Sequence, residues 1–261
     1  MNKPSFDILN SIDNDYIFDL LTFASDNIII PYHKNLKSSD ISTKSRSDDF
    51  VTVADKEVET YLTPKLLNII PDSIVVGEET QTNIIDMQDK INSNNIIWTC
   101  DPIDGTYNFV NGEEFFCTMI SICYNKVPIS AWFNFPMLGI KVMGNVNHFK
   151  IISSTFDSFQ NLSNYLNNVV KKSNLINNYA TAKNIRCAGM EALLCSLGKV
   201  DYIYHKYLTP WDHSPMDILC RSSGCIVKML DKSSFQTNSN GKLLVTRLGN
   251  NWEKISKIVN V

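Results

Sequence analysis

Hydrophobic positions along the chain alternate between helical spacing and short uninterrupted runs. Apolar residues three and four positions apart predict helices over residues 15–30, 51–67, 156–170, 190–197 and 214–223. Short apolar runs bounded by turn-forming residues predict strands over 73–76, 96–98, 118–123, 128–133, 139–143, 200–204 and 225–230. Two polar stretches lack either period: residues 38–49 are predicted to be a mobile loop and residues 80–95 a surface loop.

The interleaving of helices and strands predicts a layered α/β or α+β fold. We find no internal repeat, low-complexity linker or clear domain break, so residues 1–261 are expected to form a single domain. A chain of this length can bury a full core, and 44% hydrophobic with 20% charged residues is ordinary for a globular protein.

Charge and hydropathy argue against several classes of partner. The net charge is −3 and the Lys and Arg residues are scattered, so no basic field would recruit nucleic acid or an anionic membrane. The N-terminal residues have no apolar core followed by a small-residue cleavage site, and no apolar run approaches the roughly 20 residues of a membrane span. We therefore expect neither a signal peptide nor a membrane segment.

The seven cysteines indicate the redox environment. Their count is odd, no CxxC pair occurs and their neighbours are mostly apolar. This pattern favours reduced core thiols in the cytoplasm over a disulfide framework or a zinc site.

Acidic residues recur at the ends of short apolar elements. Asp55 follows VTVA, Glu78 follows IVVG, Asp101 and Asp104 lie in DPIDGT, and Asp212 lies in PWD. A buried carboxylate without a partner is costly, so such positions indicate a hydrogen-bond network or a cation. Oxygen-rich sites with few His or Cys suit Mg²⁺, with Mn²⁺ as an alternative.

The segment WTCDPIDGTYNF, residues 98–109, concentrates this chemistry. Proline stiffens the backbone between the two aspartates, so both carboxylates can converge on one or two metal ions, with the Ile103 carbonyl as a further oxygen ligand. Gly105 and Thr106 can then open a helix whose free N–H groups face an anion. Metal ions beside an anion-binding helix start indicate a site for phosphate hydrolysis.

Each acidic motif also has an ordinary structural explanation when taken alone. DPIDGT can be a turn, Glu78 with its neighbour a solvated pair, Asp55 a charge on a helix face, and Asp212 the N-cap of the helix that follows. Their joint occurrence in this order favours the metal site.

Four segments resemble the signature set of the inositol monophosphatase family, which comprises Mg²⁺-dependent, lithium-sensitive phosphomonoesterases. They are DDFVTVAD at 48–55, GEE at 77–79, DPIDGTYNF at 101–109 and PWDHSP at 210–215. The resemblance implies a layered αβαβα sandwich with two approximate halves, residues 1–140 carrying most of the metal site and residues 141–261 the substrate side. It also implies a homodimer.

The resemblance further implies a role for each matching residue. A first Mg²⁺ would be bound by Glu78, Asp101 and the Ile103 carbonyl. A second would be bound by Asp101, Asp104 and Asp212, with Asp101 bridging the two ions. A third, weaker ion would contact Glu78 and water.

The catalytic and phosphate-binding roles follow in the same way. Thr106, hydrogen-bonded to Asp55, would orient and deprotonate the attacking water together with Glu78. Backbone N–H groups of Gly105 and Thr106 would hold the phosphate. Lys44 stands where the family carries a mobile-loop lysine near the active site.

The substrate side departs from the family pattern. His205 stands where inositol phosphatases carry a glutamate that holds hydroxyl groups, so it is either a surface residue on an edge strand or a partner for a hydroxyl or a second phosphate. Met190 and Glu191 replace small residues; Met190 is expected to pack in the core, and Glu191 to be either solvated or a polar contact in the pocket. The WD motif continues with His213, which is expected to reshape the start of its helix.

Three functions are compatible with these residues. The leading prediction is a Mg²⁺-dependent phosphomonoesterase of the inositol monophosphatase type that hydrolyses a small phosphorylated metabolite. On the same metal core, the alternatives are a 3′(2′),5′-bisphosphate nucleotidase, a histidinol-phosphatase or a sugar bisphosphatase. From another class, the chain could be a non-catalytic family member that binds metal or a phosphorylated ligand.

Overall fold

The computed structural model describes residues 3–44, 47–80, 83–93, 95–170, 174–176, 179–181, 185–247 and 251–260. Its α-helices are α1 (Lys3–Asn10), α2 (Asn14–Ala24), α3 (Ile30–Tyr32), α4 (Val53–Ile69), α5 (Ile84–Asn92), α6 (Thr106–Val110), α7 (Phe159–Val170), α8 (Ala188–Ser196), α9 (Pro210–Ser222) and α10 (Trp252–Val259). A π-helical segment, η1 (Ser25–Ile29), joins α2 to α3, and two short 3₁₀ segments are η2 (Ser38–Asp40) and η3 (Pro136–Leu138).

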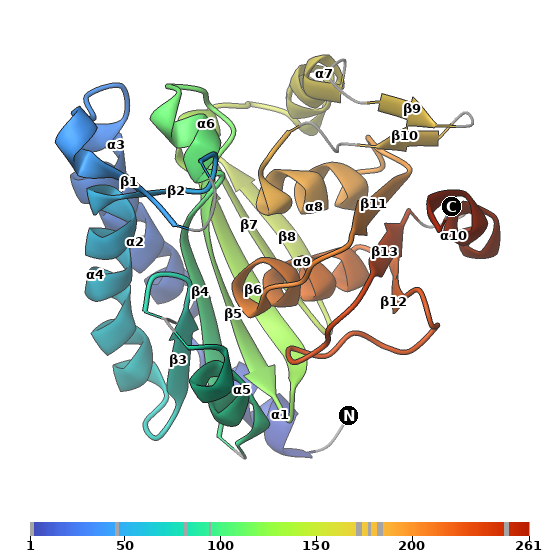
Figure 1. Ribbon diagram of the computed structural model, residues 1–261, viewed down its shortest axis with the longest axis horizontal. Coiled ribbons are helices and arrows are strands. Elements are labelled where there is room, and N and C mark those ends of the chain that lie inside the picture. Colours follow the sequence, from blue (N-terminus) through green and yellow to red (C-terminus); the bar gives the residue numbers. More distant parts are fainter. Residues whose placement is uncertain are drawn as a thin grey trace.

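A six-stranded sheet forms the centre of the molecule (Figure 1). Its strands, in spatial order, are β3 (Ile74–Gly77), β4 (Ile97–Asp104), β5 (Cys117–Tyr124), β6 (Val127–Phe135), β7 (Ile140–Asn145) and β8 (Phe149–Ser153). Strands β3 and β4 are parallel, and each later pair is antiparallel. Strand β4 is buried along its whole length, so it reads as a continuous apolar run until its final carboxylates.

A five-stranded sheet forms the second layer of strands. Its spatial order is β12 (Ile226–Met229), β13 (Leu243–Thr246), β11 (Tyr202–His205), β10 (Tyr179–Thr181) and β9 (Asn174–Ile176). Strand β11 is therefore an interior strand, antiparallel to β13 and parallel to β10. A separate two-stranded ribbon pairs β1 (Ile41–Thr43) with β2 (Phe50–Thr52).

Helices and sheets alternate as five layers (Figure 1). Helices α2 and α4 cover one face of the six-stranded sheet, α8 and α9 lie between the two sheets, and α10 packs on the outer face of the smaller sheet. One buried core, which includes Leu21, Leu62 and Trp98, lies under α2 and α4. A second, which includes Phe133 and Leu219, fills the space between the sheets. The predicted αβαβα layering is confirmed.

The structure corrects the prediction for residues 80–95. Within this stretch α5 forms in place of a loop, because the Asn83 side chain caps the helix by accepting the Ile85 N–H at 2.8 Å and Ile91 is buried against β3 and β4. In the predicted loop 38–49, residues 41–43 form strand β1, while residues 45 and 46 lie outside the described residues. The single-domain prediction and its division near residue 140 stay predictions; β7 and β8, which follow that point, complete the six-stranded sheet.

The elements that were not predicted include α1, β8, β13 and α10. Each is short, between 4 and 8 residues, so its apolar period is hard to recognise in the sequence. Among the described residues, no helix combines the length and the apolar character needed to cross a bilayer.

Candidate metal centre

A break in strand pairing brings Asp101 and Asp104 to the same side of β4. Asp101 pairs with Met119 of β5, whereas Asp104 pairs with Cys117, so three steps along β4 are matched by two along β5. In a regular strand, residues three apart point to opposite faces, but the extra residue at this bulge re-aims the second side chain. Pro102 supports the irregularity, since proline has no N–H to lose from the ladder and its carbonyl accepts the Thr118 hydroxyl at 2.8 Å.

Helix α9 supplies the third carboxylate. Thr209 is the N-cap and Pro210 the first helical residue, so Asp212 lies inside the first turn and is not the cap. The carboxylates of Asp101, Asp104 and Asp212 each place an oxygen within 4.8 Å of the others. Because α9 lies between the two sheets, this cluster joins the first part of the chain to the last.

The electrostatics of this cluster indicate that a cation belongs there. Burial, followed by repulsion from Glu78 and Asp212, raises the pKa of Asp101 well above its ordinary value. Burial and the charge of Asp212 likewise raise the pKa of Asp104 to about 7. The Oδ1 atom of Asp101 is buried and has no hydrogen-bond partner within the described part of the chain. Convergent carboxylate oxygens of this kind fit Mg²⁺ or Mn²⁺.

Asp104 also accepts hydrogen bonds from the N-terminus of helix α8. Its Oδ1 accepts the Ala188 N–H at 3.0 Å, and its Oδ2 accepts the Gly189 N–H at 2.6 Å and the Cys187 thiol at 3.0 Å. A carboxylate at a helix N-terminus is favoured by the free N–H groups and by the helix dipole. Asp104 therefore fixes α8 against the end of β4, in addition to facing the other two carboxylates.

Glu78 follows β3 and pairs with Lys44. The Lys44 Nζ lies 2.7 Å from Glu78 Oε1 and 2.7 Å from Glu79 Oε1, so one ammonium bridges both carboxylates. Burial raises the pKa of Glu78 to about 8 despite the opposing effect of Lys44, because Asp212 and Glu79 repel its charge. Burial alone would lower the pKa of Lys44, but the two carboxylates raise it above its ordinary value. The Lys44 ammonium thus neutralises part of the negative charge beside the three aspartates.

Sequence reasoning missed Glu59, which fixes the turn that carries Glu78. Its Oε2 accepts the Glu79 N–H at 2.8 Å and its Oε1 accepts the Thr80 N–H at 3.0 Å. A Cβ at Gly77 would overlap the Glu59 carboxylate, so glycine permits the close approach. The signal was available in the sequence, because Glu59 falls on the buried face of α4, one turn after Asp55.

Asp55 connects the start of α4 to Thr106. Its Oδ2 accepts both the backbone N–H and the hydroxyl of Thr52, at 2.8 and 2.5 Å, in a capping box. Its Oδ1 lies 3.2 Å from Thr106 Oγ1, which is also 2.9 Å from the Ile103 carbonyl oxygen. Burial raises the pKa of Asp55 to about 6. Gly105 precedes Thr106 in the left-handed region, at φ 90°, and caps the short helix α6 as its sequence predicts.

The substrate-side residues form a chain of hydrogen bonds. Nε2 of His205 lies 2.8 Å from Glu191 Oε2, and its Nδ1 lies 3.0 Å from Nε2 of His213. Nδ1 of His213 lies 3.0 Å from both the N and the O of Thr209. The edge-strand interpretation of His205 is therefore wrong, as is the solvated interpretation of Glu191, which is buried. Met190 packs in the core as predicted.

The surroundings shift the pKa values of the two histidines in opposite directions. Burial opposes protonation of His205, but the carboxylate of Glu191 raises its pKa above the ordinary value. Burial and the neighbouring His205 lower the pKa of His213 to about 4. His213 was placed at the start of its helix from the sequence, but its contact with His205 was not predicted.

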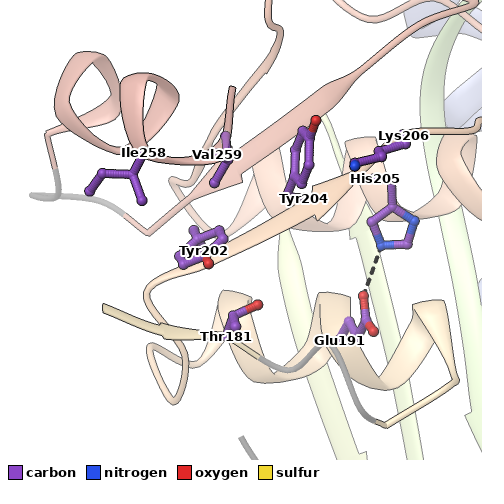
Figure 2. Close-up of a pocket in the computed structure, with 8 residues that line it drawn as sticks. All are labelled: Thr181, Glu191, Tyr202, Tyr204, His205, Lys206, Ile258 and Val259. Carbon is purple, nitrogen blue, oxygen red and sulfur yellow. Dashed lines mark hydrogen bonds and ion pairs between the residues drawn. The ribbon is translucent and has the colours of Figure 1, made fainter. Parts of the chain in front are cut away.

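A cavity of about 310 Å³ opens beside the hydrogen-bonded side chains of Glu191 and His205 (Figure 2). Its lining comes from β10, β11, α8 and the C-terminal helix α10, and comprises Thr181, Glu191, Tyr202, Tyr204, His205, Lys206, Ile258 and Val259. Glu191 lies two residues after Gly189, which contacts Asp104, so the cavity begins next to the cluster of three aspartates.

Comparisons with known proteins agree with this geometry. The model of the "Inositol monophosphatase family" matches residues 18–260. An inositol monophosphatase of Dictyostelium discoideum is 28% identical over 86% of this chain and 87% of its own. A fructose-1,6-bisphosphatase/inositol-1-monophosphatase of Thermotoga maritima is 22% identical over 84% of this chain and 86% of its own. A solved IMPase/NADP phosphatase in complex with NADP and Ca²⁺ has a TM-score of 0.73, 18% identity, and coverage of 100% of this chain and 98% of its own.

Proposed function

Because the chain belongs to the inositol monophosphatase family, a family of phosphoric monoester hydrolases, we propose that it is a Mg²⁺-dependent phosphomonoesterase that acts on a small phosphorylated metabolite by direct attack of water. The observation that carries the proposal is the convergence of Asp101, Asp104 and Asp212 beside the Asp55–Thr106 pair. A non-catalytic binding protein would have no need of that pair.

The metal ligands proposed are Glu78, Asp101, the Ile103 carbonyl, Asp104 and Asp212, for two to three Mg²⁺ ions, with Mn²⁺ as a substitute. All of them offer oxygen atoms as ligands. Without the ions, the carboxylates repel one another. When bound, such ions neutralise the phosphate dianion, lower the pKa of water and stabilise the leaving alkoxide.

The chain's own residues prepare the attack. Thr106, whose hydroxyl lies between Asp55 and the Ile103 carbonyl, orients the water, and Glu78 with Asp55 accepts its proton. Backbone N–H groups of Gly105 and Thr106 bind the phosphate. Lys44, which bridges two carboxylates beside the site, balances their charge and faces the incoming anion.

On the substrate side, Glu191 and His205 contact the leaving group. Inositol monophosphate is the leading substrate because the Dictyostelium discoideum relative, which covers most of the chain, is an inositol monophosphatase. A second candidate class comprises bisphosphate nucleotides, histidinol phosphate and sugar bisphosphates. It is favoured by His205 at the family's glutamate position and by the NADP bound in the similar phosphatase structure. A homodimer and a cytoplasmic location, the latter consistent with seven unpaired buried thiols, complete the proposal.

The test is phosphate release from a substrate panel with and without Mg²⁺, with Asp101→Asn as the blank. The panel contains inositol 1-phosphate, adenosine 3′,5′-bisphosphate, histidinol phosphate, fructose 1,6-bisphosphate and glycerol 2-phosphate. Mg²⁺-dependent release above the blank supports the phosphatase. Mg²⁺ binding by calorimetry without release from any compound supports the non-catalytic alternative.

A further inference from the structure

Two buried thiols contact the carboxylate of Asp104. Cys187, the N-cap of α8, has its Sγ 3.0 Å from Asp104 Oδ2, and Cys117, at the start of β5, has its Sγ 3.6 Å from the same oxygen. One ligand atom from each of these three residues lies within 4.8 Å of the others. Asp104 therefore belongs to two groups, the oxygen-only cluster with Asp101 and Asp212 and a second group that contains sulfur.

Sulfur is a poor choice for the hydrogen bonds that these thiols make. Cys187 Sγ accepts the Met190 N–H at 3.4 Å at the start of α8, a position where serine, threonine, asparagine and aspartate are preferred because oxygen is the better acceptor. The S–H group is also a weak donor to Asp104. A serine would make both hydrogen bonds better, so the sulfur atoms indicate a ligand that prefers sulfur to oxygen.

The spacing of the three ligand atoms suits a tetrahedral ion. An ion about 2.3 Å from sulfur and about 2.1 Å from oxygen separates those two atoms by about 3.6 Å. The two sulfur–oxygen distances are 3.6 and 3.0 Å, so a small movement of Cys187 completes the fit. Glycine at position 189 leaves room for the ligand atoms, because a Cβ there would overlap Cys117 Sγ and lie 3.2 Å from Asp104 Oδ2.

Binding of a dication leaves the charge of this group unchanged. Two S–H bonds break, two metal–sulfur bonds form, and both protons pass to solvent. Oδ2 of Asp104 loses two thiol donors and gains the cation, and it keeps the Gly189 N–H at 2.6 Å. Because no net charge is added, the burial of both thiols is compatible with the ion. Asp104 is the most exposed of the three residues, at 7%, so the ion enters from its side.

We propose that Asp104, Cys117 and Cys187 form a second metal site, which binds a thiophilic divalent cation of the Zn²⁺ type. Thiolates bind Zn²⁺ and Co²⁺, whereas Mg²⁺ takes oxygen ligands. Because Asp104 is shared, the cation at this site withdraws one ligand from the oxygen-only cluster and is an inhibitor. Cation binding stands on the three residues alone, and its effect on Mg²⁺ rests on the proposed phosphatase function. The cysteines are far apart in the sequence and form no CxxC pair, so no sequence motif marks the site.

The site is tested with Co²⁺, whose thiolate complexes have a charge-transfer absorption that complexes with oxygen ligands lack. In reduced, metal-free protein we expect this absorption to saturate at about one Co²⁺ per chain, with three ligands from the protein. Cys117→Ser and Cys187→Ser keep a hydroxyl for the hydrogen bonds, and each should weaken Co²⁺ binding at least roughly 100-fold. Cys123→Ser in the same strand and Cys195→Ser in the same helix are the matched controls and should bind Co²⁺ as wild type does.

The sharing of Asp104 is tested by competition. Mg²⁺ added to the Co²⁺-loaded protein should reduce the thiolate absorption and raise the apparent Kd for Co²⁺, because both ions need the same carboxylate. Zn²⁺ should inhibit phosphate release by wild type. In Cys187→Ser the Zn²⁺ concentration for half inhibition should rise roughly 100-fold. Each variant is compared with its own activity without Zn²⁺, so a change in the basal rate does not enter the result.

The outcomes separate this site from the phosphatase. Zn²⁺ inhibition that is equal in wild type and both serine variants overturns the inference, because the ion then acts at the oxygen-only cluster. Loss of the absorption in Cys195→Ser also overturns it, since the thiolates are then Cys195 and Cys225, whose Sγ atoms lie 3.9 Å apart. Absorption that Mg²⁺ leaves unchanged overturns the sharing of Asp104. Absence of phosphate release from every substrate refutes the phosphatase, while the Co²⁺ titration still decides the metal site.

Discussion

The carboxylate of Glu59 occupies the space that a side chain at residue 77 would need. It accepts two backbone N–H groups from the turn after β3, at 2.8 and 3.0 Å. Helix α4 thus positions two parts of the site, since Asp55, one turn earlier, contacts Thr106. The relative placement of Glu78 and Thr106 depends on a single rigid helix.

We therefore expect Gly77→Ala to impair metal binding. The added Cβ displaces the Glu59 carboxylate and releases the Glu78 turn, at a cost of about 1–3 kcal/mol in the free energy of unfolding. The Mg²⁺ concentration for half-maximal activity should rise roughly tenfold, as for other residues that orient metal ligands. Urea unfolding and Mg²⁺ titration measure the two effects.

Glu59→Gln should shift the Mg²⁺ dependence in the same direction, because an amide can accept only one of the two N–H groups well. Glu57→Gln, at the surface of the same helix, serves as control. If Glu59→Gln lowers stability but leaves the Mg²⁺ requirement at its wild-type value, the residue supports the fold and not the site.

Asp101→Asn should separate stability from activity. Removing one charge from the cluster relieves repulsion, so the metal-free variant should have a higher Tm than metal-free wild type. Activity should fall at least roughly 100-fold, and Mg²⁺ should no longer raise the Tm. Calorimetry in EDTA and in Mg²⁺ tests this; activity within a few-fold of wild type with Mg²⁺ still bound would refute the two-metal arrangement.

The residues of the candidate metal site could be singled out from the sequence because the proposed ligands lie in short motifs attached to apolar runs. Asp101 and Asp104 could be recognised as a pair, but their shared orientation depends on a bulge that a sequence does not display. Asp212 was singled out and does lie near Asp101 and Asp104, but its place inside a helix became clear only from the Thr209 cap. The place of Glu59 on the buried face of α4 could be predicted, but its contact with Thr80 in a distant segment could not.

The pH dependence of stability in the metal-free protein should have an unusual sign. Burial raises the pKa of Asp55 to about 6, of Asp104 to about 7 and of Glu78 to about 8, above the ordinary carboxyl pKa values of 3.8 to 4.5. The folded state therefore binds more protons than the unfolded state, and its stabilisation is present in acid and lost as pH rises through these values.

Urea unfolding in EDTA should accordingly show the free energy of unfolding falling between about pH 5 and pH 8. Added Mg²⁺ should weaken the trend, because it binds the ionised carboxylates. Asp101→Asn should show a smaller fall. A stability that rises over this range in EDTA would contradict the electrostatics of the cluster.

Lys44→Met should strengthen Mg²⁺ binding at Glu78. In wild type the ammonium competes for Glu78 and Glu79, so its removal leaves two carboxylates to attract a cation. We expect half-maximal Mg²⁺ to fall several-fold, with lower stability in EDTA. Lys37→Met, exposed nearby in the chain, should change neither; an increased Mg²⁺ requirement in Lys44→Met would show that the lysine supports the site.

The substrate side was harder to predict than the metal site. Strand β13 and helix α10 are short, yet they complete the small sheet and the cavity wall. His205 was recognised as a departure, but its two partners, Glu191 and His213, come from helices that precede and follow it. A row of hydrogen-bonded side chains of this kind depends on tertiary packing, which sequence spacing does not encode.

Helix α9 packs against the large sheet on one side and against α8 and β12 on the other. Its amides should therefore exchange with deuterium only through global unfolding, whereas the partly exposed turn around Glu78 and Lys44 can open locally. Asp212 thus lies in the part of the molecule that opens only on global unfolding, whereas Glu78 lies in a part that can open locally. Metal ions would enter and leave from the turn, while the helix keeps its carboxylate in place.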